Sequence, residues 1–202
     1  YPPDNFGLID TAILQQHQAA ARFYGLKNIM EVLDYSPPSL HLFNFYADCL
    51  QIGARQMQNY TLLKKVAELN KPVFLKRGVG ATIDELLGAA EYLLKYGASE
   101  VTLIERGSSG FANHVRWDLS ISMIPAVKAL TDIPIIVDAS HGTGRSDLVE
   151  PMTLAGIASG ADGFLCEIHD DPKNSLSDSE QAILPIQFQN ILNKANKIRE
   201  IL

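Results

Sequence analysis

Six polar side chains of two chemical kinds are the candidates for chemistry in this sequence of 202 residues. Three are basic, and each follows or ends a different apolar run: Arg55, Lys76 and Arg106. Basic groups that converge on one basin bind phosphate and carboxylate groups, although each alone fits a surface salt bridge equally well. In a chain with 17 Lys and Arg against 23 Asp and Glu, and hence a formal charge of −6, this pattern indicates an anionic substrate.

The other three candidates are His141, Glu167 and Asp178. One imidazole and two carboxylates form a mixed donor set that suits a divalent cation such as Mn²⁺, Fe²⁺ or Zn²⁺. Taken singly, His141 could cap the glycine-rich turn that follows it, and Glu167 could pair with Lys76. Asp178 could begin a short turn. Asp138, three residues before His141, could orient the ring of His141 or contact the water of the metal.

These residues lie at the ends of short apolar runs that alternate with amphipathic segments. The runs predict buried parallel strands at residues 28–33, 49–54, 72–76, 101–105, 133–138 and 163–168. Helices are expected at residues 9–24, 82–96, 123–130, 151–159 and 185–202. A capping box of Thr82 and Glu85 and a C-terminal Gly97 delimit the second helix, and Pro151 is expected to open the fourth.

The polar residues follow the carboxyl ends of several strands, which is the pattern of a (β/α)8 barrel. A doubly wound sheet would instead bind its ligand at one switch point. We therefore expect the α/β class and a (β/α)8 TIM barrel. The first two strands are then missing from this sequence, because it shows six where the barrel has about eight. We interpret residues 1–202 as a single, N-terminally incomplete catalytic domain, with no regulatory domain visible.

Composition argues against several classes of protein. An acidic chain without a Lys/Arg cluster is not expected to bind nucleic acid. No apolar run approaches the ~18 residues of a membrane-spanning helix, and the first residues lack the pattern of a signal peptide. The two cysteines, Cys49 and Cys166, are too few for a disulfide framework and favour a reducing compartment. We therefore expect a cytoplasmic protein without a membrane partner.

Seven sequence motifs, taken together in their order along the chain, indicate a protein family. They are residues 48–59 (DCLQIGARQMQN), 71–78 (KPVFLKRG), 105–107 (ERG), 137–144 (VDASHGTG), 145–149 (RSDLV), 160–169 (GADGFLCEIH) and 176–178 (LSD). The ordered set resembles the type I beta class of DAHP synthases, the 3-deoxy-D-arabino-heptulosonate-7-phosphate synthases. The resemblance covers the chain from about Tyr1 to Ile201. Residues 1–7 resemble the loop that follows a K-P-R-T segment in that family.

The resemblance implies a metal-dependent, aldol-like condensation of phosphoenolpyruvate with erythrose 4-phosphate, the entry step of the shikimate pathway. It implies that phosphoenolpyruvate is gripped by Arg55, Lys76 and Arg106, and that the divalent metal is held by His141, Glu167 and Asp178. We assign catalytic roles to Lys76, Glu105, Asp138 and His141, and further substrate contacts to Arg77 and Arg145. A homo-oligomer is also expected.

Two family features have no counterpart in this sequence: a metal-ligating Cys in a G-P-C-S turn, and the K-P-R-T segment. Cys49 opens a strand at the end opposite the site. Cys166 precedes Glu167, so it points outward if Glu167 points inward. We therefore expect both cysteines to be core thiols.

The acceptor sugar has two candidates. The family commonly has a basic residue for the sugar phosphate at the position of Ser109, and residues 108–113 lean toward the 3-deoxy-octulosonate 8-phosphate synthases, which use arabinose 5-phosphate. The short turn at residues 142–147 favours erythrose 4-phosphate, with Arg145 supplying the phosphate contact. A truncated, non-catalytic homologue that serves as a binding or assembly module is the remaining alternative.

Overall fold

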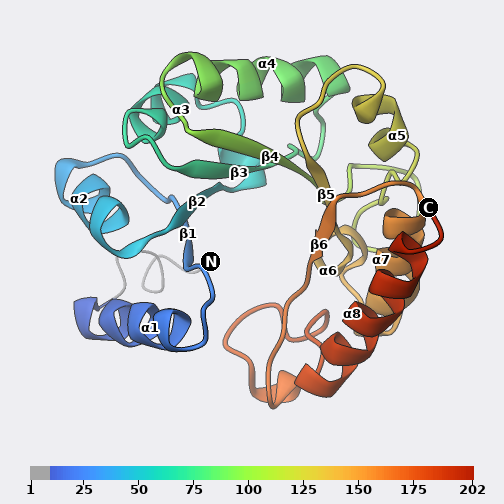
Figure 1. Ribbon diagram of the computed structural model, residues 1–202. Helices are drawn as coiled ribbons and strands as arrows, with labels where there is room; N and C mark the ends of the chain where they lie inside the picture. Colours follow the sequence, from blue (N-terminus) through green and yellow to red (C-terminus); the bar gives the residue numbers. More distant parts are fainter. Residues whose placement is uncertain (1–9) are drawn as a thin grey trace. The chain divides into compact units, whose positions relative to one another are not determined.

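The structure is a computed structural model that describes residues 10–202 as alternating strands and helices (Figure 1). In this part of the chain one sheet contains six strands in the order β1-β2-β3-β4-β5-β6. They are β1 (Ile29–Glu31), β2 (Cys49–Ile52), β3 (Pro72–Lys76), β4 (Glu100–Glu105), β5 (Ile135–Asp138) and β6 (Gly163–Leu165). Strands β1, β2 and β3 pair in parallel, as do β4, β5 and β6, with Leu50 opposite Val73 and Leu103 opposite Ile135. The predicted α/β class and parallel strands are confirmed, whereas a closed barrel of about eight strands is not shown.

Helices connect the strands, because parallel neighbours need a crossover connection. The α-helices are α1 (Thr11–Phe23), α2 (Pro37–Tyr46), α3 (Tyr60–Ala67), α4 (Ile83–Lys95), α5 (Met123–Lys128), α6 (Ala139–Thr143), α7 (Ser146–Ala158) and α8 (Pro185–Arg199). Short 3-10 turns are η2 (Ala54–Gln56) and η3 (Pro172–Asn174). Residues 1–7, which resemble a loop of the family, and the expected start of the first helix at Ile9 lie outside the described residues.

The chain divides into two compact units. The first contains the residues up to Leu75 together with Leu87–Val101. Its core consists of fully buried aliphatic side chains from β2, α3, β3 and α4: Leu50, Ile52, Leu63, Val66, Leu75 and Leu93. Gly25, with a φ of +66°, follows α1 in the left-handed conformation that is common for a glycine just after a helix.

The second unit contains Lys76–Leu86 and Thr102–Leu202. Its core lies among β4, β5 and the helices after them, with fully buried Leu103, Ile135, Val137 and Val149. Helix α7 packs closely on β5 at Gly156. A Cβ atom at this position would lie only 2.6 Å from the Cγ1 atom of Val137, so the close approach requires glycine. Strand β5 is buried at every position, as a strand covered on both faces must be.

The predicted position of Pro151 is wrong. Helix α7 begins at Ser146, so Pro151 lies inside the helix rather than in its first turn. Gly144, with a φ of +68°, ends α6, and the Ser146 N–H then donates to the Glu180 carbonyl at 2.9 Å. The helix can therefore start before the proline. The segment expected as a short turn at residues 142–147 consists of the end of α6 and the start of α7.

Candidate metal and anion site

The site is built on the junction between β5 and α6, within the second unit. Asp138 ends β5 and caps α6, since its Oδ1 atom accepts the backbone N–H of His141 at 2.9 Å. The other carboxylate oxygen, Oδ2, lies 2.8 Å from Nδ1 of the His141 ring. Because an ionised carboxylate can only accept, Nδ1 carries a hydrogen, and in the neutral ring the lone pair is then on Nε2. Asp138 therefore fixes both the backbone and the ring of His141.

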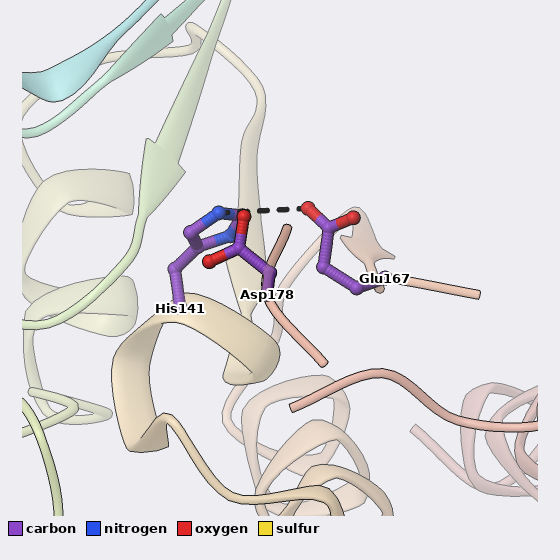
Figure 2. A group of neighbouring side chains, drawn as sticks. All are labelled: His141, Glu167 and Asp178. Carbon is purple, nitrogen blue, oxygen red and sulfur yellow. Dashed lines mark ion pairs between the residues drawn. The ribbon is translucent and has the colours of Figure 1, made fainter. Parts of the chain in front are cut away.

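The free nitrogen of His141 faces two carboxylates (Figure 2). Nε2 lies 3.5 Å from Oε1 of Glu167. One ligand atom each from His141, Glu167 and Asp178 lie within 4.8 Å of one another. Glu167 follows β6, and its N–H donates to the Ser140 hydroxyl at 3.1 Å, which ties it to α6. Asp178 lies in the loop before α8 and adopts a left-handed backbone conformation, with a φ of +54°.

These three residues fit a divalent metal ion. An imidazole nitrogen and two carboxylate oxygens are the donor set of borderline cations such as Mn²⁺, Fe²⁺ and Zn²⁺. Burial raises the pKa of Glu167, and the charges of Asp138 and Asp178 raise it further, against the opposing effect of His141 and Lys76. A cation placed among these carboxylates would relieve that repulsion. The predicted metal ligands are thus brought together, and the ion itself stays a prediction.

A buried lysine lies on the other side of Asp138. Nζ of Lys76, at the end of β3, is 3.4 Å from Oδ2 of Asp138, and both side chains are almost fully buried. Burial alone raises the pKa of Asp138, but the hydrogen bond from His141 and the charges of His141 and Lys76 outweigh it and hold that pKa below its ordinary value. Asp138 is therefore an ionised carboxylate shared by a lysine and a histidine.

Arg106 begins the segment after β4 and is also buried. Its guanidinium carbon lies 5.4 Å from the ring centre of Trp117, a distance at which a cation interacts with the face of an indole. Lys76 and Arg106 thus both belong to the second unit, at the carboxyl ends of β3 and β4. Arg55 lies in η2, directly after β2 in the first unit, and its side chain is exposed.

Glu105 and Arg77 form a buried ion pair. Nε of Arg77 lies 2.6 Å from Oε2 of Glu105, and Nη2 donates to Oε1 at 2.8 Å. The same carboxylate accepts the N–H groups of Gly107 and Ser120, while Arg77 also donates to the Ala81 carbonyl. These contacts brace the segment after β4. The predicted roles of Glu105 in catalysis and of Arg77 in substrate binding stay predictions.

Arg145 is exposed and has partners of its own. Its Nε and Nη2 atoms donate to the carboxylate of Asp147, and Nη1 donates to the His114 carbonyl at 3.1 Å. A substrate phosphate would have to compete with these contacts. The contact of Arg145 with substrate stays a prediction.

Two residues that were not predicted from the sequence contact the candidate metal ligands. Ser140 supports Glu167 as described above. Arg116, in the segment after β4, has its Nη1 atom 3.8 Å from Oδ1 of Asp178. No local sequence pattern indicates that Arg116 lies near Asp178, because its position depends on how the segment 107–120 folds against the end of α6. For Ser140 a signal existed, since it lies between Asp138 and His141 in the same motif.

Both cysteines are free and half-buried, and neither belongs to the cluster of metal-ligand side chains found among the described residues. Cys166 packs with Phe164 and Phe188 against the apolar cluster of Val149, Ile183 and Ile191. Burial raises the pKa of its thiol to about 12, so it is an inert thiol at neutral pH. The outward orientation predicted for Cys166 is thereby confirmed.

Sequential parallel strands with a His/Glu/Asp set and buried cations at their carboxyl ends define an α/β protein with a candidate metal and anion site. Comparison with known proteins narrows this class. The sequence profile of the DAHP synthetase I family matches residues 3–202. This chain therefore belongs to the DAHP synthetase I family.

Similar proteins carry two names. A phospho-2-dehydro-3-deoxyheptonate aldolase of Thermotoga maritima is 40% identical over 189 residues, which are 94% of this chain and 55% of that protein. A 2-dehydro-3-deoxyphosphooctonate aldolase of Desulfotalea psychrophila is 31% identical over 163 residues, or 75% of this chain and 57% of that protein. The chain thus spans little more than half the length of these relatives.

Solved structures show the same fold. The crystal structure of the Thermotoga maritima DAHP synthase matches with a TM-score of 0.92 and 38% identity, covering 100% of this chain and 59% of that one. A truncated form of the Thermotoga enzyme matches with the same TM-score over 96% of this chain and 74% of that one. Helices of the described residues are too short or too polar to cross a membrane.

Proposed function

We propose that this protein, in its intact form, is a 3-deoxy-7-phosphoheptulonate synthase that condenses phosphoenolpyruvate with erythrose 4-phosphate. The observation that carries the proposal is the shared carboxylate of Asp138, which contacts Lys76 on one side and His141 on the other. This contact joins the anion-binding lysine to the metal-binding histidine in one network. Membership of the family and the 40% identity with an enzyme of that name support the activity.

The cationic side chains would hold phosphoenolpyruvate. Lys76 and Arg106 offer charge-assisted hydrogen bonds to its phosphate and carboxylate groups, each worth on the order of 1.5–3 kcal/mol. Arg55 is assigned as a third cation from the resemblance to the family. Because Lys76 and Arg106 are buried and held by Asp138 and Trp117, they lose little freedom when the anion binds.

The carbon–carbon bond forms between C3 of phosphoenolpyruvate and the aldehyde carbon of the acceptor. Water adds at C2, and inorganic phosphate leaves. A divalent ion held by His141, Glu167 and Asp178 would supply Lewis-acid polarisation of the acceptor's carbonyl oxygen. The cations of the site would hold the charge of the phosphate and carboxylate groups in place throughout.

Glu105 and Arg77 would position this machinery. Their buried ion pair holds Gly107 and Ser120, the two ends of the segment that carries Trp117 and Arg116. A closed (β/α)8 barrel is our proposal for the intact protein, supported by the sequential strand order and the TM-score of 0.92. Cytoplasmic location and assembly as a homo-oligomer are further parts of the proposal.

The proposal is tested by two steady-state assays on the intact protein with Mn²⁺. Phosphoenolpyruvate is supplied with erythrose 4-phosphate in one and with arabinose 5-phosphate in the other, and phosphate release is measured. We expect a higher kcat/KM with erythrose 4-phosphate, and loss of the activity on chelation or in His141→Ala. A higher kcat/KM with arabinose 5-phosphate would contradict the choice of acceptor, and full activity after exhaustive chelation would contradict the metal.

A further inference from the structure

Arg116 is held in place by its backbone beside the candidate metal site. Its N–H donates to the carbonyl of Thr143, at the end of α6, at 2.8 Å. Its side chain lies over Gly144, where an added Cβ atom would be 2.6 Å from Cβ of Arg116. The segment that carries Arg116 is tied down at Gly107 and Ser120, both of which donate to Glu105. The position of Arg116 is therefore built into the fold of the second unit.

The guanidinium group of Arg116 faces a carboxylate that the metal needs. Nη1 is 3.8 Å from Oδ1 of Asp178, and the Arg116 side chain is 50% exposed while that of Asp178 is 20% exposed. Asp178 is one of the three residues of the candidate metal set. In this arrangement a built-in cation neutralises part of the charge that a divalent ion would neutralise.

The neighbouring Arg145 differs in its partners. Its guanidinium donates to the carboxylate of Asp147 and to the backbone carbonyl of His114, rather than to a candidate metal ligand. The hydrogen bonds with Asp147 hold the guanidinium in a two-pronged pair, and they raise the pKa of Arg145. Of these two exposed arginines, Arg116 has the longer and weaker ion pair, and it is the one that a cation at Asp178 would disturb.

We infer that Arg116 is the counter-cation that a divalent ion displaces from Asp178, and that the displaced guanidinium then binds the phosphate group of the acceptor sugar. This inference rests on the proposed function. Two cations cannot share Asp178 without repulsion, so metal binding weakens the Arg116–Asp178 pair. A half-exposed guanidinium without that partner is a donor for a phosphate monoester at the edge of the metal site.

Linkage makes the inference measurable. If the phosphate draws Arg116 away from Asp178, it removes a competitor of the metal, so the phosphate monoester and the metal must strengthen each other's binding by the same factor. A guanidinium that only braces Asp178 predicts the opposite effect of its removal, namely weaker metal binding. The sign of the change in metal affinity therefore separates the two roles.

The experiment measures Mn²⁺ affinity by electron paramagnetic resonance of free Mn²⁺, on the intact wild-type protein and on Arg116→Gln and Arg116→Lys. Phosphoenolpyruvate is kept saturating to fill the Lys76 and Arg106 cations. Each titration is then run twice. One contains glycerol 3-phosphate, a phosphate monoester without an aldehyde, and the other contains glycerol as the control without phosphate. A protein-free titration corrects for Mn²⁺ bound by the phosphates. Arg199→Gln, which removes an exposed arginine at the end of α8, is the matched control.

We expect Arg116→Gln to bind Mn²⁺ about three- to tenfold more tightly than the wild type, and Arg116→Lys to resemble the wild type, because charge rather than shape opposes the ion. Glycerol 3-phosphate should tighten Mn²⁺ binding in the wild type and have no effect in Arg116→Gln. Unchanged or weaker Mn²⁺ binding by Arg116→Gln overturns the counter-cation role. A persistent effect of glycerol 3-phosphate in that variant overturns the phosphate contact. Absence of Mn²⁺ binding by the wild type would instead overturn the metal site of the proposed function.

Discussion

At the scale of single residues, Asp138 has the largest number of roles in the site. One oxygen caps α6 through the His141 N–H, and the other contacts the His141 ring and Lys76. A buried carboxylate with two cationic or donor neighbours stays ionised, which explains why the pKa of Asp138 lies below its ordinary value although burial opposes this. In the neutral ring of His141, this contact selects the tautomer with its lone pair on Nε2, which is the tautomer that a metal ligand needs.

Asp138→Asn tests this role. The asparagine amide has only one acceptor oxygen, because its nitrogen is a donor. It cannot accept both the ring hydrogen and the backbone hydrogen of His141 on separate atoms, so the ring loses its fixed orientation. We expect Mn²⁺ affinity to fall by about 10- to 100-fold, measured by titration against a fluorescent chelator. Asp147→Asn is the control, because Asp147 pairs with Arg145 and not with His141. Equal losses in the two variants would show that the effect is not specific to His141.

At the scale of elements, short connections hold strands and helices in register. Asp162, just before β6, accepts the Ile135 N–H at the start of β5 at 2.9 Å and the Lys128 ammonium at the end of α5 at 2.7 Å. Burial raises the pKa of Asp162, but these hydrogen bonds outweigh it and hold the pKa below the ordinary value of 3.8. Asp162 therefore links α5, β5 and β6.

The sign of the pH dependence follows from that lowered pKa. A carboxyl whose folded pKa is lower than its unfolded pKa contributes stability above the unfolded value and loses it as the pH falls through the folded value. We expect Asp162→Asn to lower the free energy of unfolding by about 1 kcal/mol at neutral pH, mostly through the bond to Ile135, since the exposed pair with Lys128 contributes little.

The measurement is urea unfolding of both proteins from about pH 6 to about pH 3. The difference in stability between wild type and Asp162→Asn should shrink at the acid end, where the aspartate becomes protonated. A difference that stays constant over this range would show that the charge of Asp162 contributes nothing.

Two glycines in the same chain give opposite expectations. Gly107 has a φ of +90°, and an added Cβ atom would lie 2.7 Å from Cβ of Trp117 and 3.0 Å from Cα of Gly142. Gly88 lies inside α4 with nothing within 4 Å of such an atom. We expect Gly107→Ala to lower the free energy of unfolding by more than about 1 kcal/mol, and Gly88→Ala to raise it by about 0.5–1 kcal/mol. Chemical denaturation checks both, and equal effects would contradict the packing around Gly107.

At the scale of the whole molecule, we expect metal binding and folding to be coupled, because the candidate ligands come from segments far apart in the sequence. His141 lies in α6, Glu167 follows β6, and Asp178 precedes α8. An unfolded chain does not hold these groups within 4.8 Å of one another, so we expect the ion to bind the folded state preferentially.

Excess Mn²⁺ should therefore stabilise the protein. At a free concentration of about 100 Kd, the free energy of unfolding rises by about 2.7 kcal/mol, and the melting temperature rises with it. Calorimetry with and without Mn²⁺ measures the shift. His141→Ala should show no shift, and chelation should return the wild type to its metal-free melting temperature. The same Mn²⁺-dependent rise in His141→Ala would place the ion elsewhere.

Much of the fold and site was determined by the sequence alone. Buried parallel strands read as apolar runs, and the residues directly after them necessarily meet at one edge of a sheet, so Lys76, Glu105, Asp138 and Glu167 could be placed at strand ends. The capping box of Thr82 and Glu85 was also predicted, and both of its hydrogen bonds are present. These features depend on contacts within a few residues or on strand periodicity.

The tertiary structure alone decided which of these groups contact one another. Arg77 pairs with Glu105, Lys76 with Asp138, and Arg116 with Asp178, and each pair joins residues from different elements. The early start of α7 likewise depends on the distant Glu180 carbonyl, which accepts the Ser146 N–H. Side-chain charge and local propensity do not specify such partners. The partners are set by the path of the chain between the elements and by the burial that the packed strands and helices impose.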